Sequence, residues 1–588
     1  MPTGLSGTAM KDPPNAARGP LRALARCRGA FLGVGLLSAA VNLLMLTGSI
    51  FMLEVYDRVL PSRSVPTLVG LVAVAGLLYL FLGLFDLIRN RILARVGDAF
   101  DAALSARIHD IVLVRPLRRG ADGDALQPLR DVDQVRSYLA GSGPAALFDL
   151  PWLPFYLAIC FAFHFWIGVT AAAGAALLMA LTIATEFGTR RHVAAAVGHA
   201  TARQALAEGG RRNAEAVRAM GMAPRLTARW TDANRRYLAS QRRAADVAAG
   251  LGAGSRVARM MLQSGVLAVG AYLVIGQEAS AGLIIASSIL VARAVAPVEQ
   301  LIATWKGFVA ARQSLGRLRA LCAQHPPEPA RMPLPPPAAG LVASGLCVVP
   351  PGARRAVVQD VELRLAAGHA VGIIGPSASG KSSLARALVG VWAPARGTIR
   401  LDGLDLAHWP AERLGRHVGY LPQDVELFAG SVAENIARFD PEARAEQIIA
   451  AARAADVHEL IATLPDGYDT QIGDGGAVLS AGQRQRIGLA RALFGDPFLV
   501  VLDEPNSNLD AEGDAALTKA ILGIRLRQGI AVVVAHRPSA LASVDLVLAM
   551  KHGRVAAFGP RDEVLRQATP QLAPLRRPEP ALAAMAAN

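Results

Sequence analysis

The stretch GPSASGKSS, residues Gly375–Ser383, contains the pattern G-x-x-x-x-G-K-[ST] of a phosphate-binding P-loop (Walker A). An apolar run, AVGII (Ala370–Ile374), precedes it and predicts a buried strand, and a helical run, SLARALVGVW (Ser383–Trp392), follows it. A strand, a glycine-rich loop and a helix in this order place backbone N–H groups and a helix N-terminus around a phosphate. The sequence therefore predicts a nucleotide-binding α/β domain.

The residue types in this loop have separate chemical roles. We expect Lys381 to neutralise the β- and γ-phosphates, and the hydroxyl of Ser382 to ligate Mg²⁺. A glycine-rich turn without a ligand is the alternative, and the flanking strand and helix argue against it. The predicted ATP-binding residues of the loop are Gly375, Pro376, Ser377, Ala378, Ser379, Gly380, Lys381, Ser382 and Ser383.

Two later strands end in residues suited to the same site. FLVVLDEP (Phe498–Pro505) is an apolar strand that ends in two carboxylates. As the first acid, Asp503 is expected to hold Mg²⁺, and Glu504 is expected to polarise the attacking water. GIAVVVAHRP (Gly529–Pro538) brings His536 to the same carboxyl edge of the sheet, where ligands of such sheets bind. His536 is therefore predicted to contact the γ-phosphate.

A second phosphate-binding loop is predicted in LSAGQRQRIGLAR (Leu479–Arg491), where a polar turn precedes an arginine-rich helix. The hydroxyl of Ser480 and the backbone at Gly482 lie at the N-terminus of that helix, which favours an anion. Because the P-loop already supplies one phosphate site, this loop suits a nucleotide held by another copy of the chain. We therefore predict a homodimer, and a helix cap without a ligand is the alternative.

The composition predicts a large membrane domain. Apolar residues make up 53% of the 588 residues and charged residues 18%, against about 45–50% and about 25% in soluble proteins. Arg293 and Pro297 interrupt the last of the apolar runs, and Arg293 either reaches the inner face or lines a polar transport path. Runs long enough to span a bilayer lie at 29–53, 65–87, 144–163, 166–186, 259–277 and 281–301.

Charge and proline content set the orientation and the domain boundaries. Arginine-rich segments between the spans predict a cytoplasmic N-terminus and a cytoplasmic ATPase domain. The net charge of +15 is attributed to an anionic membrane surface, and no nucleic-acid partner is expected. The fold class is thus an α-helical six-span membrane domain followed by an α/β P-loop ATPase domain. The predicted parts are a cytoplasmic lead-in (1–28), a transmembrane domain (29–320), a proline-rich linker (321–340), a nucleotide-binding domain (341–570) and a disordered tail (571–588).

Taken in order, the P-loop, Gln423 in YLPQD, LSAGQ, LVVLDE, SNLD and His536 resemble the ATP-binding cassette. Six spans before one cassette resemble an ABC half-exporter of exporter type I. The resemblance implies ATP and Mg²⁺ as cofactors, with Gln423 contacting the nucleotide and joining Ser382 and Asp503 around the metal. It also implies that Asp510 lies at the dimer contact. The signature loop, made of Ser480, Ala481, Gly482 and Gln483, would then act on the ATP of the partner copy.

Four stretches resemble one branch of that family, the permease/ATPases of type I secretion systems that export proteases and lipases. They are FMLEVYDRVLPSRSVPTLVGL (Phe51–Leu71), FDLPWLPFYL (Phe148–Leu157), RAVAPVEQ (Arg293–Gln300) and LDEPNSNLD (Leu502–Asp510). The resemblance implies a multi-pass protein of a Gram-negative inner membrane that exports an unfolded protein with a C-terminal signal. Its implied partners are a periplasmic adaptor (membrane fusion) protein and a TolC-like outer-membrane channel. The alternatives are a half-exporter of lipid or small molecules and a membrane-tethered ATPase that regulates a partner.

Two positions depart from the family pattern. Ala481 replaces the usual glycine of the signature loop, so we expect slower turnover rather than none. Val349 lies where many cassettes stack an aromatic side chain on adenine, so the contact with the base is expected to be apolar and weakly selective.

Overall fold

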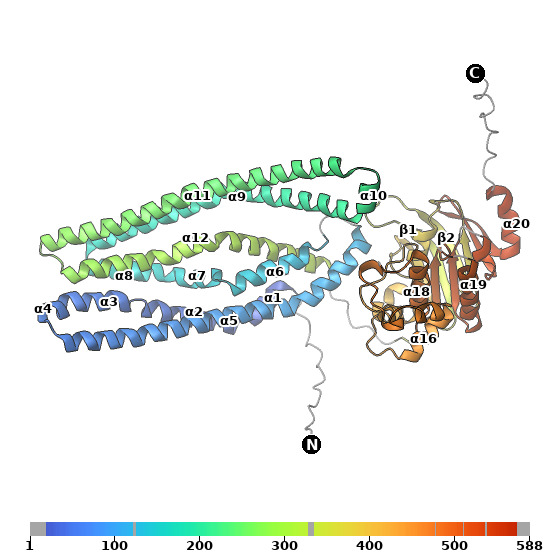
Figure 1. Cartoon of the computed structure of the whole chain (residues 1–588), viewed down its shortest axis with the longest axis horizontal. Helices are drawn as coiled ribbons and strands as arrows, with labels where there is room; N and C mark the ends of the chain where they lie inside the picture. Colours follow the sequence, from blue (N-terminus) through green and yellow to red (C-terminus); the bar gives the residue numbers. More distant parts are fainter. Residues whose placement is uncertain are drawn as a thin grey trace, which may run out of the picture. The chain divides into compact units, whose positions relative to one another are not determined.

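The computed structural model describes residues 19–120, 125–326, 334–476, 478–507, 509, 511–535 and 538–572. The described chain forms two compact units, one of residues 19–113 and 125–326 and the other of residues 114–120 and 334–572. The first is helical, and the second combines sheets with helices (Figure 1). Residues 1–18 of the predicted lead-in, 327–333 of the predicted linker and 573–588 of the predicted tail lie outside the described residues.

Within the described residues, six helical segments are long and apolar enough to cross a membrane, which confirms the predicted fold class of this unit. They are Arg28–Ser62, Val65–Arg118, Gly143–Phe163, Phe165–Arg212, Ala223–Ile275 and Ala281–Gln324. Several extend far beyond the bilayer. The 55-residue helix α5 (Val65–Arg119) is about 80 Å long at 1.5 Å per residue, whereas a hydrocarbon core is about 30 Å thick.

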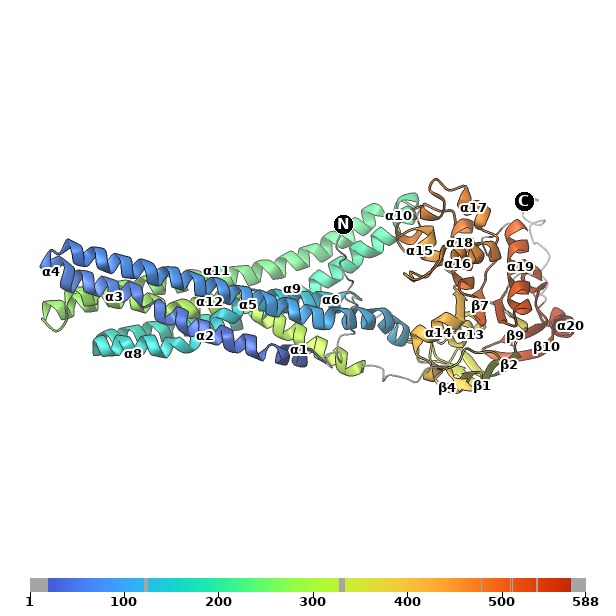
Figure 2. The same ribbon diagram turned by 90° about the horizontal axis from the view of Figure 1, so that it is seen from below.

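The long helices run beside one another, and α9 and α11 lie side by side along most of their length (Figures 1 and 2). His164 separates α8 from α9 with extended backbone, and its Nδ1 accepts a hydrogen bond from the backbone N–H of Trp166 at 3.2 Å. Helix α12 continues through Pro297, four residues into the segment predicted as linker. Besides α5, the helices are α1 (Pro20–Arg26), α2 (Arg28–Leu44), α3 (Thr47–Glu54), α4 (Leu60–Ser62), α6 (Gln127–Ala140), α7 (Gly143–Asp149), α8 (Leu153–Phe163), α9 (Phe165–Arg212), α10 (Ala214–Ala219), α11 (Ala223–Ile275) and α12 (Ala281–Gln324).

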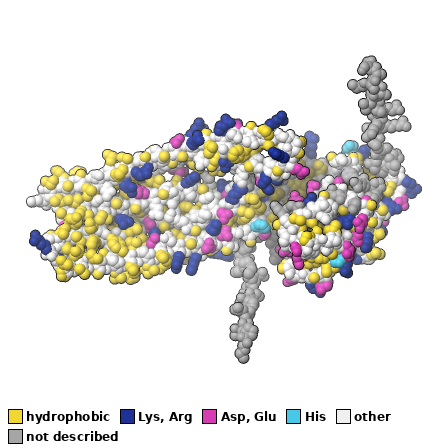
Figure 3. Space-filling model, viewed as in Figure 1, with side chains coloured by type: hydrophobic (Ala, Val, Ile, Leu, Met, Phe, Trp, Pro, Cys, Tyr) yellow, Lys and Arg dark blue, Asp and Glu magenta, His cyan; other side chains and the backbone are white. Residues whose placement is uncertain are grey.

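The outer surface of the helical unit is apolar toward the end that carries α3 and α4 and carries more Lys and Arg toward the end that carries α10 (Figure 3). The exposed apolar side chains include Leu36 on α2 and Leu77 and Leu80 on α5. Exposing many large apolar side chains costs free energy in water, whereas contact with lipid is favourable for them. The surface therefore supports the membrane assignment that the composition predicts.

A buried polar cluster joins α2, α5, α7 and α8. The Arg89 guanidinium donates to both carboxylate oxygens of Asp149, each at 3.0 Å. The Asn42 amide donates to Asp149 Oδ1 at 2.8 Å, and the Tyr156 hydroxyl donates to the backbone carbonyl of Asn42 at 2.8 Å. Because buried charges require partners, this cluster fixes how the four helices are placed against one another.

The second unit is built on two sheets. The six-stranded sheet has the order β10-β9-β3-β8-β7-β6, and it is parallel except for β10, which pairs antiparallel with β9. The four-stranded sheet, β2-β1-β4-β5, is antiparallel. This is the predicted α/β arrangement. The strands are β1 (Gly340–Val348), β2 (Val358–Ala366), β3 (Ala370–Ile374), β4 (Arg396–Leu401), β5 (Leu404–Asp405), β6 (Val418–Leu421), β7 (Leu499–Asp503), β8 (Ile530–Val534), β9 (Leu546–Lys551) and β10 (Arg554–Pro560).

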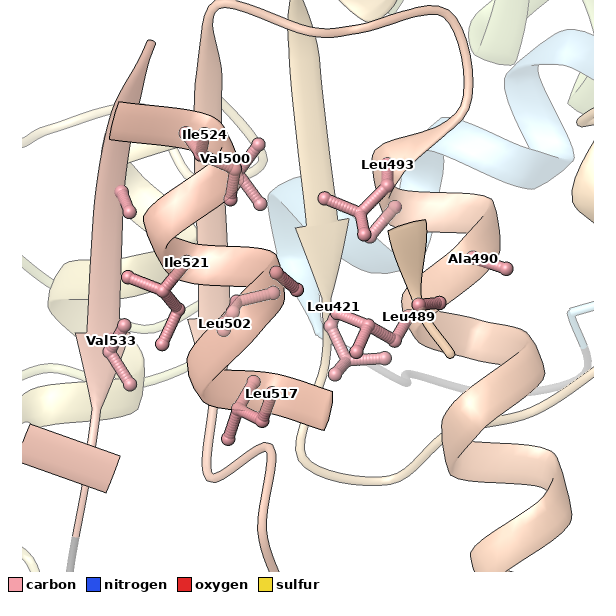
Figure 4. Packing of buried hydrophobic residues seen from close by; sticks show 14 of the residues in the cluster. Leu421, Leu489, Ala490, Leu493, Val500, Leu502, Leu517, Ile521, Ile524 and Val533 are labelled. Atoms are coloured by element: carbon pink, nitrogen blue, oxygen red, sulfur yellow. The ribbon is translucent and has the colours of Figure 1, made fainter. Parts of the chain in front are cut away.

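Alternate residues of the buried strands pack on opposite faces of the six-stranded sheet. Val500 and Leu502 of β7 pack in one core with Leu489 of α18 and Ile521 of α19 (Figure 4). Leu499 and Val501 join the opposite core, together with α13 and the four-stranded sheet. Covering both faces explains why these strands are apolar throughout. The helices are α13 (Lys381–Leu388), α14 (Ala411–His417), α15 (Val432–Ile436), α16 (Ala445–Ala454), α17 (His458–Ala462), α18 (Ala481–Leu493), α19 (Ala511–Leu526) and α20 (Arg561–Leu572).

Candidate active site

The P-loop connects the end of the fully buried β3 to the start of α13. Gly375 has φ 153° and Gly380 has φ 96°. A Cβ at Gly375 would lie 2.3 Å from the carbonyl oxygen of Met550, and one at Gly380 would lie 2.5 Å from that of Val357. Both positions therefore require glycine, and a glycine-rich loop between a strand and a helix is suited to present its backbone N–H groups to a phosphate. Pro376, Ser377 and Ala378 are exposed between them.

Lys381 begins α13, and its side chain folds back over the loop. Its ammonium donates to the carbonyl oxygens of Gly375 and Pro376, both at 3.0 Å. Burial lowers the pKa of the Lys381 ammonium, and the carboxylates of Glu504 and Asp503 oppose that shift. A buried cation held by neutral carbonyls is well placed to bind phosphate oxygens, which would compensate its charge better.

Asp503 ends β7 and is completely buried. Its Oδ1 accepts a hydrogen bond from the Ser382 hydroxyl at 3.0 Å, while its Oδ2 has no hydrogen-bond partner among the described residues. Burial raises the pKa of the Asp503 carboxyl, and Ser382 acts against that rise. A hard oxygen donor left unpartnered beside a serine hydroxyl fits a Mg²⁺ site.

Glu504 follows directly in a strained conformation. Its φ of 50° lies in the left-handed region, which costs a residue with a side chain about 1–3 kcal/mol. Its backbone N–H donates to the carbonyl of Val534 on β8 at 3.0 Å. The Gln423 amide donates to Glu504 Oε2 at 3.1 Å. Gln423 therefore lies beside the predicted catalytic carboxylate.

The signature loop forms the N-terminus of α18. Ser480 Oγ accepts a hydrogen bond from the backbone N–H of Gln483 at 3.2 Å, and Gln483 Oε1 accepts one from the N–H of Ser480 at 2.8 Å. This reciprocal capping box satisfies two donors at the helix start. Ser480 and Ala481 are exposed, and Gly482 is half-buried. The loop is thus pre-formed and open to another molecule.

The remaining predicted residues fall into two groups. Val349 follows β1 and Ser383 lies on the first turn of α13, and both are half-buried. His536 and Asp510 lie outside the described residues, so their roles stay predictions. The structure brings five of the predicted residues together. Ser382 contacts Asp503, Gln423 contacts Glu504, and the Lys381 ammonium lies within electrostatic reach of both carboxylates.

Gln485 is a further residue of this site that the motifs do not predict, and its side chain is buried. Its amide donates to the carbonyl of Pro505 at 2.5 Å, with the carbonyl of Glu504 at 3.3 Å. The signal was available, because Gln485 lies four residues before the buried Leu489 and so on the same face of α18. A glutamine in an apolar stripe requires a polar partner.

Replacing Asp503 by asparagine is expected to raise the melting temperature of the nucleotide-free protein by about 1–3 °C at pH 7.5. With its pKa raised, the folded carboxyl contributes stability below its unfolded pKa, and this contribution is lost as pH rises through the folded pKa. At pH 7.5 the buried carboxylate is therefore a cost that asparagine removes. Scanning fluorimetry in detergent checks this, and the gain should shrink at acidic pH. A lower melting temperature at pH 7.5 would contradict it.

Comparison with family models places the chain among membrane transporters. The ABC transporter model matches residues 358–507, and the ABC transporter transmembrane region model matches residues 31–298. The first contains the P-loop, the signature loop and Asp503, and the second contains five of the six candidate spans in full or in large part, together with the start of α12.

Comparison with individual proteins is more specific. The chain is 59% identical to the type I secretion system ATP-binding protein PrsD of Rhizobium meliloti, over 93% of this chain and 94% of that protein. It is 30% identical to the cyclolysin secretion/processing ATP-binding protein CyaB of Bordetella pertussis, over 92% of this chain and 77% of that protein. A solved structure of a bacterial Atm1-family ABC exporter with ATP bound matches with a TM-score of 0.79 at 23% identity, over 94% of this chain and 100% of that one. That last likeness concerns the fold.

Proposed function

The chain belongs to the type I secretion system ATP-binding proteins of the ABC transporter family, and from this premise we propose how it works and with what partners. It hydrolyses ATP to drive protein export. We propose that it does so in the inner membrane of a Gram-negative cell, on an unfolded substrate with a C-terminal signal. A periplasmic adaptor and a TolC-like channel would complete the path. The six candidate spans and the site of Ser382, Asp503 and Glu504 lie in one chain and support an ATP-driven transporter. The likeness to a type I secretion system ATP-binding protein supports a protein as its cargo.

Two copies are proposed to share each nucleotide. The P-loop of one chain would hold the phosphates, and Ser480–Gln483 of the other would close over them. The exposure of Ser480 and Ala481 at a capped helix N-terminus supports this, because such a terminus attracts an anion and here faces away from its own core. Asp510 is proposed to lie at the contact between the copies.

Hydrolysis is assigned to residues at the carboxyl edge of the sheet. Asp503, Ser382 and Gln423 would hold Mg²⁺, which supplies charge neutralisation of the phosphates when bound. Lys381 would exchange the carbonyls of Gly375 and Pro376 for phosphate oxygens. Release of the Gln423 hydrogen bond would free the Glu504 carboxylate to orient water and accept its proton. His536 is proposed to contact the γ-phosphate.

ATP binding can drive transport only if it favours one conformation of the protein over another. In this proposal ATP binds best when both chains contribute to each site, so it stabilises the closed pair. Hydrolysis removes that preference and returns the pair to the open state. The membrane helices would alternate with these two states and move the substrate outward.

The test of cargo class uses proteoliposomes containing the full chain. ATPase activity should rise on addition of the C-terminal segment of a protein encoded beside the gene, and the same segment in scrambled order is the control. Stimulation by lipid or small amphiphiles alone would favour a lipid or small-molecule exporter. Hydrolysis without movement of any candidate protein, in vesicles that also hold the adaptor, would favour a regulatory ATPase.

Replacing Ala481 by glycine is expected to raise kcat by about two- to fivefold. Ala481 is the first residue of α18 and its side chain is exposed, so its methyl group would meet the partner's nucleotide. Glycine costs about 1 kcal/mol in a helix interior and less at a first helical position, so the gain should appear in turnover and not in thermal stability. Steady-state ATPase assays check this, and an unchanged or lower kcat would contradict it.

A further inference from the structure

Gln485 connects the signature helix to the strained turn that carries the catalytic carboxylate. Its side chain is 3% exposed. Its Nε2 lies 2.5 Å from the carbonyl oxygen of Pro505, 3.3 Å from that of Glu504 and 3.4 Å from Ser507 Oγ. A single amide nitrogen thus faces three acceptors of one turn, Glu504–Ser507.

The turn requires stabilising contacts, because the left-handed backbone conformation of Glu504 is strained. On the sheet side, its N–H donates to the carbonyl of Val534 at 3.0 Å. Within the turn, the N–H of Ser507 donates to the Glu504 carbonyl at 3.3 Å. Gln485 holds the turn from the opposite side, the side of α18. A shift of α18 would therefore change the backbone that aims the Glu504 carboxylate.

Helix α18 is suited to carry such a shift as one piece. It has 13 residues, a capping box at its start and a mostly buried body beyond its first turn. Gln485 lies five residues after Ser480, which is about 7.5 Å along the axis. A displacement of the signature loop by a bound phosphate would reach Gln485 without passing through a flexible joint.

We propose that Gln485 is a positioning residue that couples the two nucleotide sites of the pair. The signature loop contacts the ATP held by the partner. Gln485 transmits the presence or absence of that ATP to Glu504, which acts on the ATP held by its own chain. The inference rests on the proposed sharing of each nucleotide between two copies. It makes each site's chemistry depend on occupancy of the other, which is a coupling free energy between sites.

The test replaces Gln485 by methionine, which keeps the length of the side chain and removes its donors. The matched control is Gln447→Met on α16, which breaks a helix-capping hydrogen bond outside the site, between Gln447 Oε1 and the N–H of Arg444. ATP hydrolysis by the full chain is measured against ATP concentration. We expect Gln485→Met to lower kcat about tenfold, leave the half-saturating ATP concentration within about twofold, and reduce the Hill coefficient toward 1.

A second variant covers the case in which methionine prevents folding. Gln485→Asn keeps the amide and withdraws it by about 1.5 Å, so it should show the same pattern more weakly. The inference is overturned if either folded variant retains the Hill coefficient and kcat of the wild type, or changes no more than Gln447→Met. If instead the wild type shows neither cooperativity nor a need for two chains, it is the proposed function that fails.

Discussion

Replacing Glu504 by glutamine is expected to lower ATP hydrolysis by about 10²–10⁴-fold while ATP still binds. Glutamine keeps the size of the side chain and loses the ability to accept a proton from water. The P-loop, Lys381 and Asp503 are untouched, so the closed pair should form and persist. Gel filtration with ATP should therefore show a long-lived nucleotide-bound dimer, and phosphate release should be nearly absent.

The matched control is Glu512→Gln on the first turn of α19, an exposed carboxylate that pairs at 3.7 Å with Arg486. Its hydrolysis rate should stay within about twofold of the wild type, because the Glu512 side chain is 76% exposed and water solvates either form of it. Rapid hydrolysis by the Glu504→Gln protein would remove Glu504 from the role of catalytic base.

Replacing Lys381 by alanine is expected to abolish measurable ATP binding, with a loss of at least about 100-fold in affinity, or ~2.7 kcal/mol. The ammonium lies in the middle of the P-loop, so its loss removes the positive charge that this loop would supply to the phosphates. Calorimetric titration of the detergent-solubilised protein measures the effect.

Lys519→Ala is the control for this loss of a positive charge. Lys519 lies on α19 and pairs at 3.6 Å with Asp456, and both side chains are largely exposed. Its removal should leave ATP affinity unchanged within about twofold. If Lys381→Ala bound ATP as well as Lys519→Ala, the assignment of the P-loop lysine would be wrong.

The fold class could be predicted from the sequence because its signals are local. The runs AVGII, LVVLD and IAVVV are apolar throughout, which is what strands covered on both faces require. The spans follow from length and hydropathy. Helix ends were harder to place, since α5 and α9 continue for tens of residues beyond the membrane thickness without a break in helical periodicity.

The parts that could not be predicted depend on contacts between distant segments. Gln423 and Glu504 are 81 residues apart, and nothing local to YLPQD indicates that its amide reaches that carboxylate. The left-handed backbone of Glu504 hydrogen-bonds to strand β8 and to Gln485 of α18, which are contacts that the local sequence does not reveal. Ala481 departs from the family pattern, and the effect predicted for it depends on the proposed contact with a second chain.

The most direct test of the shared site combines two inactive chains, one with Lys381→Ala and the other with Ser480→Arg. If each nucleotide lies between the P-loop of one copy and the signature loop of the other, a mixed pair has one site with both changes and one intact site. Co-expression at equal amounts should then restore between roughly one fortieth and one quarter of wild-type hydrolysis, since about half of the pairs are mixed and one of the two sites in each is intact. The upper value holds if the intact site works independently, and the lower value holds if the empty site slows it about tenfold. Activity no higher than that of either variant alone would contradict the account.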